Sequence, residues 1–396
     1  MKVTVFCRGL AHSLKLSEQL HRRGALRRMV SGYPSFKLRH SSLPSQKIVS
    51  LATVFSQIAV ARMPFIGRYL APACDYWNRV VFDRLAARYV CGADVAVVWM
   101  HSTPYLLKLA RRHGAIAILE CGAVHSAHLR EILMEQYARL GLEFWDRTSC
   151  ILYPTSFNAE LAQYDEANYL AVPSEFVRQS FLSKGIPAQK LLKASYGTDC
   201  EGFRPAPKAD GVFRILYVGT LSVLKGVPVL LEAWRRLNWG RTAELALVGR
   251  VSPELSSTLR KPFPGVRLLG RFNHEDLQRV YSQASIFVFP SWGDGWPLVV
   301  GEAMACGLPV ICTPNSGACE LVRDGVEGFV VPAGDADALA ERISFLRASE
   351  KLRQEMGRAA RKRAECYSWE RYGEQVMENL SAVLADRTTG CAQVAV

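Results

Sequence analysis

The residues best suited to chemistry lie in one stretch of the chain, between Pro290 and Pro309. An apolar run ends at Pro290, a glycine-containing loop follows, and a helix is expected to begin with a proline at its first position, Pro297. The unpaired N–H groups and the positive dipole end of a first helical turn favour a phosphate or a polarised sugar oxygen. Asp294 in the loop and Glu302 in the helix could hold two hydroxyl-bearing parts of one extended ligand. On their own, they equally fit a turn residue and an exposed helix acid.

Alternating strands and helices must position these carboxylates. Apolar runs predict strands at 2–7, 93–100, 116–119 and 169–172, and again at 213–218, 244–248, 266–269, 286–289, 309–312 and 328–331. Helical patterns are expected at 14–24, 227–237, 276–283, 298–306, 336–346 and 353–384, and over most of 40–90. This order predicts parallel sheets with helices on both faces.

A proline-bounded stretch at 204–207 divides this pattern into two halves. We therefore expect an α/β chain with two facing Rossmann-like domains, 1–204 and 205–366, followed by a C-terminal helix and tail, 367–396, which can cross back to the first domain. Ligands of such sheets bind at the carboxyl ends of the strands, so the cleft between the halves is the expected site.

Composition excludes some classes and leaves others open. Apolar residues make up 49% of the 396, which excludes wholesale disorder, and a net charge of +13 favours an anionic partner. The eleven cysteines form no CxxC pair, and the run Cys306, Cys312 and Cys319 lacks zinc-site spacing, so reduced thiols and no metal are expected. With no signal-peptide pattern and no membrane-spanning run, a cytoplasmic location is expected.

Several blocks occur in a family-specific order. They are 172–177 (VPSEFV), 196–199 (YGTD) with 203–205 (FRP), 218–222 (VGTLS) with 225–226 (KG), 270–272 (GRF), 302–305 (EAMA), 307–310 (GLPV) and 324–329 (DGVEGF). The chain resembles family 4 retaining glycosyltransferases (glycosyl transferases group 1), which have the GT-B fold. The resemblance is dense over 169–346 and thin before 120.

The resemblance implies roles for individual residues. Lys225 would neutralise the diphosphate of a nucleotide-sugar donor, and Glu302 would hold the ribose hydroxyls. Gly9 would let the backbone approach the phosphates closely. Further donor contacts are expected from the backbone of Arg271 and Phe272 at the nucleobase, and of Gly295, Trp296, Leu298 and Val299 at the phosphate and sugar.

This chain departs from the family pattern at two positions. Asp294 stands where most relatives have a longer glutamate, and Thr220 stands where many have an arginine. Arg250 could replace the missing charge, or be a surface arginine. A first-domain histidine usually faces the transferred sugar in this family; we expect His125, with His101 and His128 as competitors.

The implied function is hexosyl transfer (EC 2.4 class) from a nucleotide sugar to a glycan, lipid-linked or small-molecule acceptor, as in polysaccharide biosynthesis. Displacement would occur on the front face with retention of configuration, without a metal cofactor. The alternatives are a non-catalytic nucleotide-sugar or glycan-binding GT-B protein, a GT-B phosphorylase and an epimerase. A dehydrogenase is disfavoured by the lack of a GxGxxG fingerprint, and a nucleic-acid partner by the lack of any known module.

Basic residues among apolar ones in the first half also favour peripheral attachment to an anionic membrane, at its inner face. The basic residues are Arg27, Arg28, Lys37, Arg39, Arg62 and Arg68, and the apolar ones Phe36, Phe65 and Ile66. The rival interpretation is an ordinary basic surface over a buried core.

Overall fold

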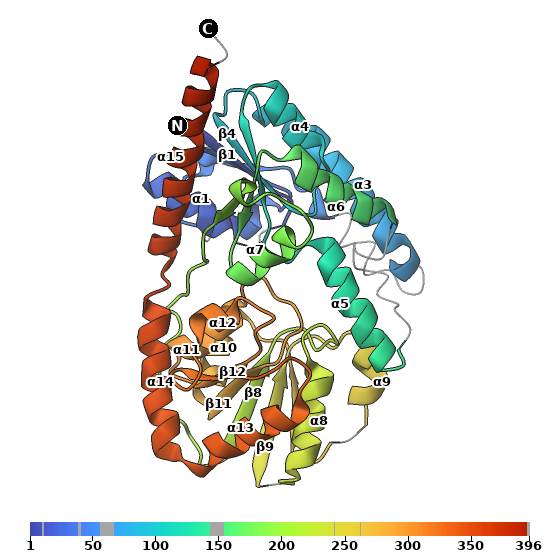
Figure 1. Ribbon diagram of the computed structural model, residues 1–396, viewed down its shortest axis with the longest axis vertical. Helices are drawn as coiled ribbons and strands as arrows, with labels where there is room; N and C mark the ends of the chain where they lie inside the picture. Colours follow the sequence, from blue (N-terminus) through green and yellow to red (C-terminus); the bar gives the residue numbers. More distant parts are fainter. Residues whose placement is uncertain are drawn as a thin grey trace.

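Two parallel β-sheets organise the molecule, seen in a computed structural model that describes residues 1–9, 12–38, 41–55, 67–142, 154–240, 242–261 and 263–393 (Figure 1). Within these residues the first sheet has the order β3-β2-β1-β4-β5-β6-β7 and the second the order β10-β9-β8-β11-β12-β13. All neighbouring strands run parallel. This is the predicted α/β class.

The first sheet lies between residues 3 and 193, and the second between 213 and 330. The strands of the first are β1 (Val3–Cys7), β2 (Leu26–Ser31), β3 (Ile48–Ser50), β4 (Val95–Trp99), β5 (Ile116–Glu120), β6 (Tyr169–Val172) and β7 (Leu191–Lys193). Those of the second are β8 (Phe213–Val218), β9 (Ala243–Val248), β10 (Val266–Gly270), β11 (Ile286–Phe289), β12 (Val310–Cys312) and β13 (Gly328–Val330). The central strands β4, β5 and β11 are buried along their whole length, as their unbroken apolar runs predict.

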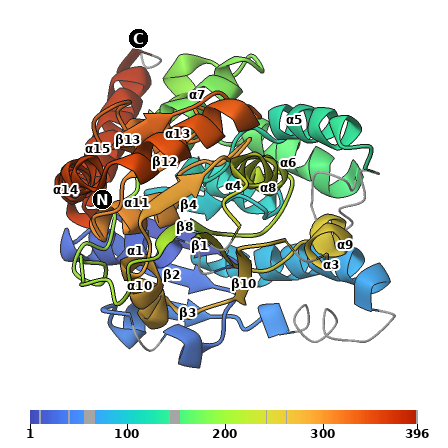
Figure 2. The ribbon, with the colours of Figure 1, turned by 90° about the horizontal axis from the view of Figure 1, so that it is seen from below.

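Helices flank both sheets (Figures 1 and 2). Around the first are α1 (Ser13–Arg22), α3 (Gly67–Ala86), α4 (Tyr105–Arg112), α5 (Ser126–Arg139), α6 (Pro154–Glu166) and α7 (Glu175–Leu182). Around the second are α8 (Val227–Leu237), α9 (Ser256–Leu259), α10 (His274–Ser282), α11 (Leu298–Ala305), α12 (Ala318–Leu321) and α13 (Ala336–Ala348). Among the described residues, no helix is both long and apolar enough to cross a bilayer.

Two helices, α14 (Glu350–Glu365) and α15 (Trp369–Gln393), replace the single helix expected at 353–384. The hydroxyl of Ser368 accepts a hydrogen bond from the N–H of Arg371 at 3.1 Å, so this serine starts a new helix. Helix α14 packs on α11 and α15 packs on α1, which confirms that the chain end crosses back to the first sheet (Figure 1).

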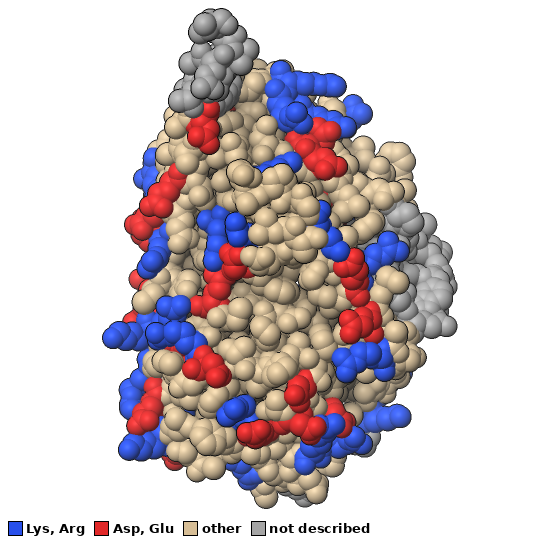
Figure 3. Space-filling view, in the orientation of Figure 1, with Lys and Arg blue, Asp and Glu red and all other residues tan. Residues whose placement is uncertain are grey.

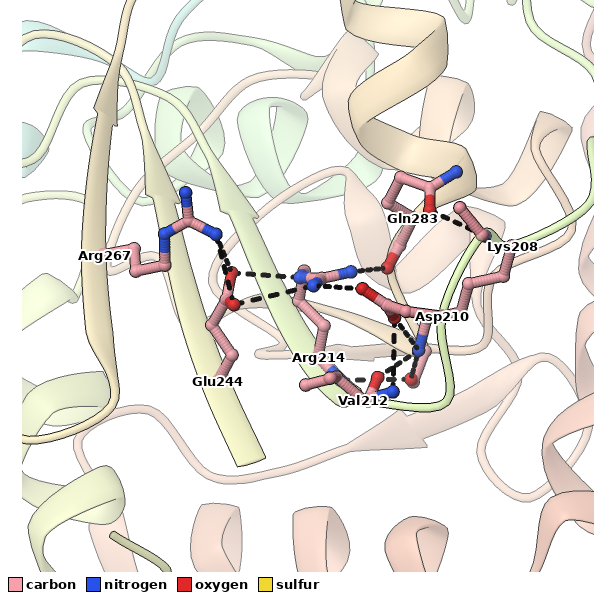
Figure 4. Close-up of polar contacts among 9 residues, drawn as sticks. Lys208, Asp210, Val212, Arg214, Glu244, Arg267 and Gln283 are labelled. Atoms are coloured by element: carbon pink, nitrogen blue, oxygen red, sulfur yellow. Dashed lines mark hydrogen bonds and ion pairs between the residues drawn. The ribbon is translucent and has the colours of Figure 1, made fainter. Parts of the chain in front are cut away.

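The linker between the sheets is fixed to the second one by Arg214 of β8 (Figure 4). Its guanidinium donates to Glu244 of β9 and to Asp210 of the linker, each at 2.9 Å. Beside it, Lys208 donates to Ser285 at 2.9 Å. The predicted domain boundaries at 204 and 366 stay predictions.

Candidate functional site

The carboxyl ends of the two sheets meet. Gly295, which follows β11, lies so close to Gly122, which follows β5, that a Cβ on Gly295 would overlap the Gly122 carbonyl oxygen. A Cβ on Gly317, after β12, would stand 3.1 Å from the Cβ of Ser174, after β6. Ligands of such sheets bind at these ends, so the residues gathered here form the candidate site.

Lys225 and Asp294 form an ion pair at this junction. The Lys225 Nζ donates to Asp294 Oδ2 at 2.5 Å, and the two side chains are 22% and 19% exposed. Gly226 makes the pair possible, because its φ of +70° suits glycine and any Cβ there would overlap the Pro290 carbonyl oxygen. The Trp292 N–H also donates to the Leu224 carbonyl at 2.9 Å. The loops after β8 and β11 are thereby held together.

The segment from Asp294 to Val299 leads directly into helix α11. Asp294 bridges to Ser316, and its carbonyl accepts from the Gly317 N–H at 3.1 Å. Pro297 precedes the first helical residue, Leu298, rather than occupying that position as expected, because its ψ of 101° is extended. Trp296 is buried, whereas Leu298 and Val299 are half-buried. Helix α11 begins four residues after Asp294, and the Val300 N–H donates to the Pro297 carbonyl at 3.0 Å. The N–H groups of Leu298 and Val299, ahead of it in the first turn, have no carbonyl to bond within the helix.

Glu302 takes part in a second polar group on α11. Its Oε2 accepts a hydrogen bond from the Tyr281 hydroxyl at 2.9 Å, and burial raises the pKa of the carboxyl. The charges of His274 and Asp199 also act on it, in opposite directions, and these two lie 3.6 Å apart. Glu302 is therefore not the exposed helix acid of the alternative interpretation. Asp199 was named only within the 196–199 block, without a role, and Tyr281 and His274 were not predicted. A tyrosine on the apolar face of a helix looks like any core aromatic.

The remaining predicted donor contacts lie on loops at the same end of the second sheet. Thr220 and Arg250 have exposed side chains, the Thr220 carbonyl accepts from the Tyr217 hydroxyl at 2.8 Å, and the Arg250 carbonyl accepts from the Leu221 N–H at 2.8 Å. Arg271 and Phe272 follow β10 and are exposed. In the first sheet, a Cβ on Gly9 would meet nothing within 4 Å, so the fold leaves space there.

His125 caps helix α5 with its side chain. Its Nδ1 accepts from the Ala127 N–H at 3.2 Å, and its ring packs 4.7 Å from that of Tyr164 and 5.1 Å from that of Phe181. Burial lowers the pKa of this histidine to about 4. One ring nitrogen is thus engaged in local structure.

Of the two competing histidines, one follows β4 and the other lies on α5, three residues after His125. His101 follows β4 with a φ of +67°, and its Nδ1 is 2.6 Å from Glu160 Oε1. His128 lies on α5, its ring 6.4 Å from that of Phe176.

A fourth histidine, His12, was missed. It precedes α1, and its ring centroid lies 4.5 Å from that of Tyr196 and 6.2 Å from that of Trp369. Burial lowers its pKa to about 4, while the charge of Asp294 acts in the opposite direction. Its position in the sequence could have pointed to it, because the first loop after β1 lies at the carboxyl end of a central strand.

Known proteins are similar to this chain in sequence and in fold. Residues 212–349 match the family model of glycosyl transferases group 1. The chain is 33% identical over 189 residues to the amylovoran biosynthesis glycosyltransferase AmsK of Erwinia amylovora, an alignment covering 44% of this chain and 46% of AmsK. It is also 33% identical over 159 residues to the capsular polysaccharide biosynthesis glycosyltransferase CapM of Staphylococcus aureus, covering 39% and 41% respectively. The chain spans about half the length of the curated relatives that it matches.

Solved structures resemble the whole chain. Sucrose-phosphate synthase from Thermosynechococcus elongatus superposes with a TM-score of 0.68 at 19% identity, covering 98% of this chain and 100% of that one. Anabaena HepE in complex with UDP-glucose has a TM-score of 0.66 at 18% identity, covering 96% and 100%. These structures are GT-B glycosyltransferases, and they confirm the predicted fold of two Rossmann-like domains. Residues 212–349 thus match the glycosyl transferases group 1 family model, within a chain that has the GT-B fold.

Proposed function

We propose that this protein is a retaining glycosyltransferase that moves a hexose from a nucleotide sugar to a glycan, lipid-linked or small-molecule acceptor. The observation that carries the proposal is the Lys225–Asp294 pair at the start of α11, in the part of the chain that matches the family. A donor diphosphate is a stronger partner for Lys225 than one carboxylate is, because it carries more charge.

The donor would be held by groups that surround this pair. Lys225 and the first N–H groups of α11 would neutralise the diphosphate, and Asp294 would turn to a sugar hydroxyl. Glu302, steadied by Tyr281, would accept hydrogen bonds from the ribose. The loops that carry Arg271, Phe272, Thr220 and Arg250 would enclose the nucleotide.

The proposed reaction is a front-face displacement. The bond from the anomeric carbon to the leaving phosphate oxygen breaks, and a bond to the acceptor oxygen forms on the same face. The acceptor's proton passes to the departing diphosphate. The protein's contribution is to orient the sugar and to stabilise the charge that grows on the leaving group, using Lys225 and the α11 N-terminus. No step of this scheme requires a metal ion.

A thermal-shift panel of UDP-glucose, UDP-galactose, GDP-mannose and ADP-glucose tests donor binding first. A donor at one hundred times its Kd stabilises the folded state by about 2.7 kcal/mol. Lys225→Ala should abolish that shift, whereas Lys351→Ala, which removes an exposed lysine of α14, should not. Absence of any shift in the wild type would contradict the proposal.

Product analysis then separates the candidate activities. Transfer with retention gives a product whose anomeric proton couples as in the donor, which NMR measures directly. Binding without turnover would indicate the non-catalytic alternative. Phosphate-dependent release of a sugar phosphate would indicate a phosphorylase, and isomerised donor without acceptor an epimerase.

We further propose that the first domain docks on an anionic bilayer through helix α3. Trp77, Val81 and Leu85 recur every four residues on one face and are 64%, 47% and 43% exposed. Phe36 and Phe55, also exposed, lie with ring centroids 6.2 Å apart. A bilayer is favoured over a neutral protein partner because the chain carries a net charge of +13.

Two of the basic residues expected in this attachment are engaged within the protein. Arg28 lies over the Tyr89 ring and Arg27 donates to the Tyr89 carbonyl, so both are engaged locally. Arg39, Arg62, Phe65, Ile66 and the Arg68 side chain lie outside the described residues. On the face seen in Figure 3, acidic and basic side chains are interspersed rather than segregated.

Flotation with phosphatidylglycerol vesicles tests the docking. The wild type should float with the vesicles and Trp77→Ser/Val81→Ser should not, whereas Phe345→Ser, at an exposed apolar residue of α13, should behave as the wild type. A wild type that stays with the soluble fraction at low salt would contradict the attachment.

A further inference from the structure

Glu320 of α12, in the second half, is bonded to the first half through both oxygens of its carboxylate. Oε1 accepts a hydrogen bond from the N–H of Glu175, the first residue of α7. Oε2 lies 2.7 Å from the Nζ of Lys193, the last residue of β7, and the Glu320 side chain is 20% exposed. In Figure 1, α12 lies at the edge of the second half that faces α7. One carboxylate therefore joins the two halves.

The contact with Glu175 caps a helix from outside its own half. The first N–H groups of a helix have no partner within it, and a negative charge there is favoured by the helix dipole. The Ser174 side chain accepts from the Val177 N–H at 3.2 Å and so satisfies one of these groups in α7. The Glu320 carboxylate satisfies the N–H of Glu175. Helix α7 is thus capped jointly by both halves.

Within the second half, Glu320 is fixed by its backbone. Its carbonyl accepts from the Arg363 guanidinium at 2.9 Å and from the Tyr367 hydroxyl at 3.1 Å. Its N–H donates to the Gly317 carbonyl at 3.2 Å, and the Gly317 N–H donates to the Asp294 carbonyl at 3.1 Å. The residue that caps α7 is therefore tied to the loop that holds Asp294.

Within the first half, α7 fixes the loop that meets the second sheet. The hydroxyl of Ser180 on α7 accepts from the His125 N–H at 3.0 Å, and the Phe181 ring packs 5.1 Å from the His125 ring. The same loop contains Gly122, whose carbonyl lies against Gly295. The helix that Glu320 caps thus supports the part of the first half that lies closest to the Asp294 loop.

We propose that Glu320 is a positioning residue, which sets how the first half meets a donor held by the second; this rests on the function proposed above. It contacts α7 and Lys193 on one side and the loop of Asp294 on the other. A misplacement of about 1 Å at a reacting centre can cost roughly 100-fold in rate. Donor affinity should depend little on Glu320, because the proposed donor contacts lie within the second half.

Three carboxylate variants test this role. Glu320→Ala removes both contacts, whereas Glu320→Gln keeps an oxygen that accepts from the Glu175 N–H. Glu166→Ala is the control, because it removes a carboxylate of α6 that is 27% exposed and pairs with two basic residues of the same half. For the panel donor that binds, Glu320→Ala should lower kcat for nucleotide release about tenfold. Its donor Kd should change less than about threefold, and Glu320→Gln and Glu166→Ala should keep kcat within about threefold of the wild type.

Glu175→Pro removes the same contact from the other half and leaves α12 intact. Proline is tolerated at the first position of a helix, and Ser174 before it already has the extended backbone that a following proline requires. Glu175→Pro should lower kcat as Glu320→Ala does. The double variant should lose little more than Glu320→Ala alone, because both changes remove one hydrogen bond.

Hydrogen exchange gives a readout that a purely local role of Glu320 would not move. In Glu320→Ala, the amides at 175–177 should exchange at least about fivefold faster, although they belong to the other half. In Glu320→Gln they should stay near the wild-type rate. If Glu320 only stabilises α12, the faster exchange will stay within 315–322.

The outcomes separate the two proposals. A wild type that neither binds nor turns over any panel donor overturns the glycosyltransferase function. An active wild type with an equally active Glu320→Ala overturns the positioning role alone. So does faster exchange confined to α12, or a donor affinity that falls as much as kcat. If Glu320→Ala fails to fold, Glu175→Pro decides by the same kcat and Kd comparison.

Discussion

At the scale of single residues, the site depends on close approaches that few side chains tolerate. Gly226 has a left-handed backbone and touches Pro290, and this contact brings Lys225 to Asp294. Sequence reasoning identified Lys225 and Asp294 but not their pairing, because the two are 69 positions apart. Only the packing of one loop on the other brings them into contact.

Gly226→Ala should therefore damage both stability and donor binding. A Cβ at a φ of +70° is strained, and this one would also overlap the Pro290 backbone, so we expect a loss of more than about 2 kcal/mol in the free energy of unfolding. Gly211→Ala is the control, because a Cβ there meets nothing within 4 Å and φ is not positive. Urea unfolding measures the stability of both variants. Equal stabilities would show that the loop relaxes without cost.

Glu120, at the end of β5, should make the stability of the folded protein depend on pH. Burial raises its pKa to about 7, although the Tyr196 hydroxyl donates to Oε1 at 2.8 Å and acts in the opposite direction. A carboxyl whose pKa is higher in the folded protein favours folding less as it ionises. The stability of the wild type should therefore fall between pH 4.5 and 8, by on the order of 3 kcal/mol from this group.

Glu120→Gln removes this titration and keeps an oxygen for Tyr196. Its free energy of unfolding should exceed that of the wild type at pH 8, and the difference should shrink towards pH 4.5. Chemical denaturation at several pH values measures it. If the difference in free energy of unfolding between the two proteins stays constant with pH, Glu120 is not the group that titrates.

At the scale of elements, the sequence predicted the strands with continuous apolar runs and missed the others. β6, β8, β11 and α8 have the predicted bounds. β8 and β11 are almost wholly buried, as their apolar runs predict, whereas β6 alternates between buried and half-buried residues. β3 and β7 are three-residue strands at the ends of the first sheet and carry polar residues, so their short patterns resemble loops. Tertiary pairing, not local pattern, makes them strands.

One arginine joins three of these elements, and its loss should be costly. Arg214 of β8 bonds Glu244 of β9, Asp210 of the linker and the carbonyl of Gln283 after α10 (Figure 4). Because Arg214 and Glu244 are mostly buried, Arg214→Met leaves a carboxylate poorly compensated and should destabilise the protein by about 3 kcal/mol. Arg235→Met, which breaks an exposed pair within α8, should cost far less, because water screens that pair. Similar losses of stability in Arg214→Met and Arg235→Met would contradict this account of the linker.

At the scale of the whole molecule, the chain passes between the two halves twice, near 197–198 and near 367–369, and these two segments contact each other. The Thr198 N–H donates to the Tyr367 carbonyl at 2.7 Å, and Gly197 lies against the backbone of Trp369. Lys193 of β7 also pairs with Glu320 of α12 at 2.7 Å. The first half is thereby positioned over the second with the carboxyl ends of both sheets together. Sequence patterns predicted the two halves and their order, but they hold no information on which loops touch.

The contact between Gly295 and Gly122 can be broken without disturbing either core. The Cβ of Gly295→Ala would overlap a backbone oxygen of the other half, so the halves must separate slightly, whereas Gly293→Ala would meet only the flexible ends of Leu129 and Leu224 at 3.3 and 3.4 Å. We expect Gly295→Ala to lower kcat at least tenfold through misplacement of groups from the two sheets, with a small change in Tm. Gly293→Ala should stay near wild type. Small-angle scattering should show a larger radius of gyration for Gly295→Ala alone, and unchanged scattering with unchanged kcat would mean that the approach of the halves is not required for turnover.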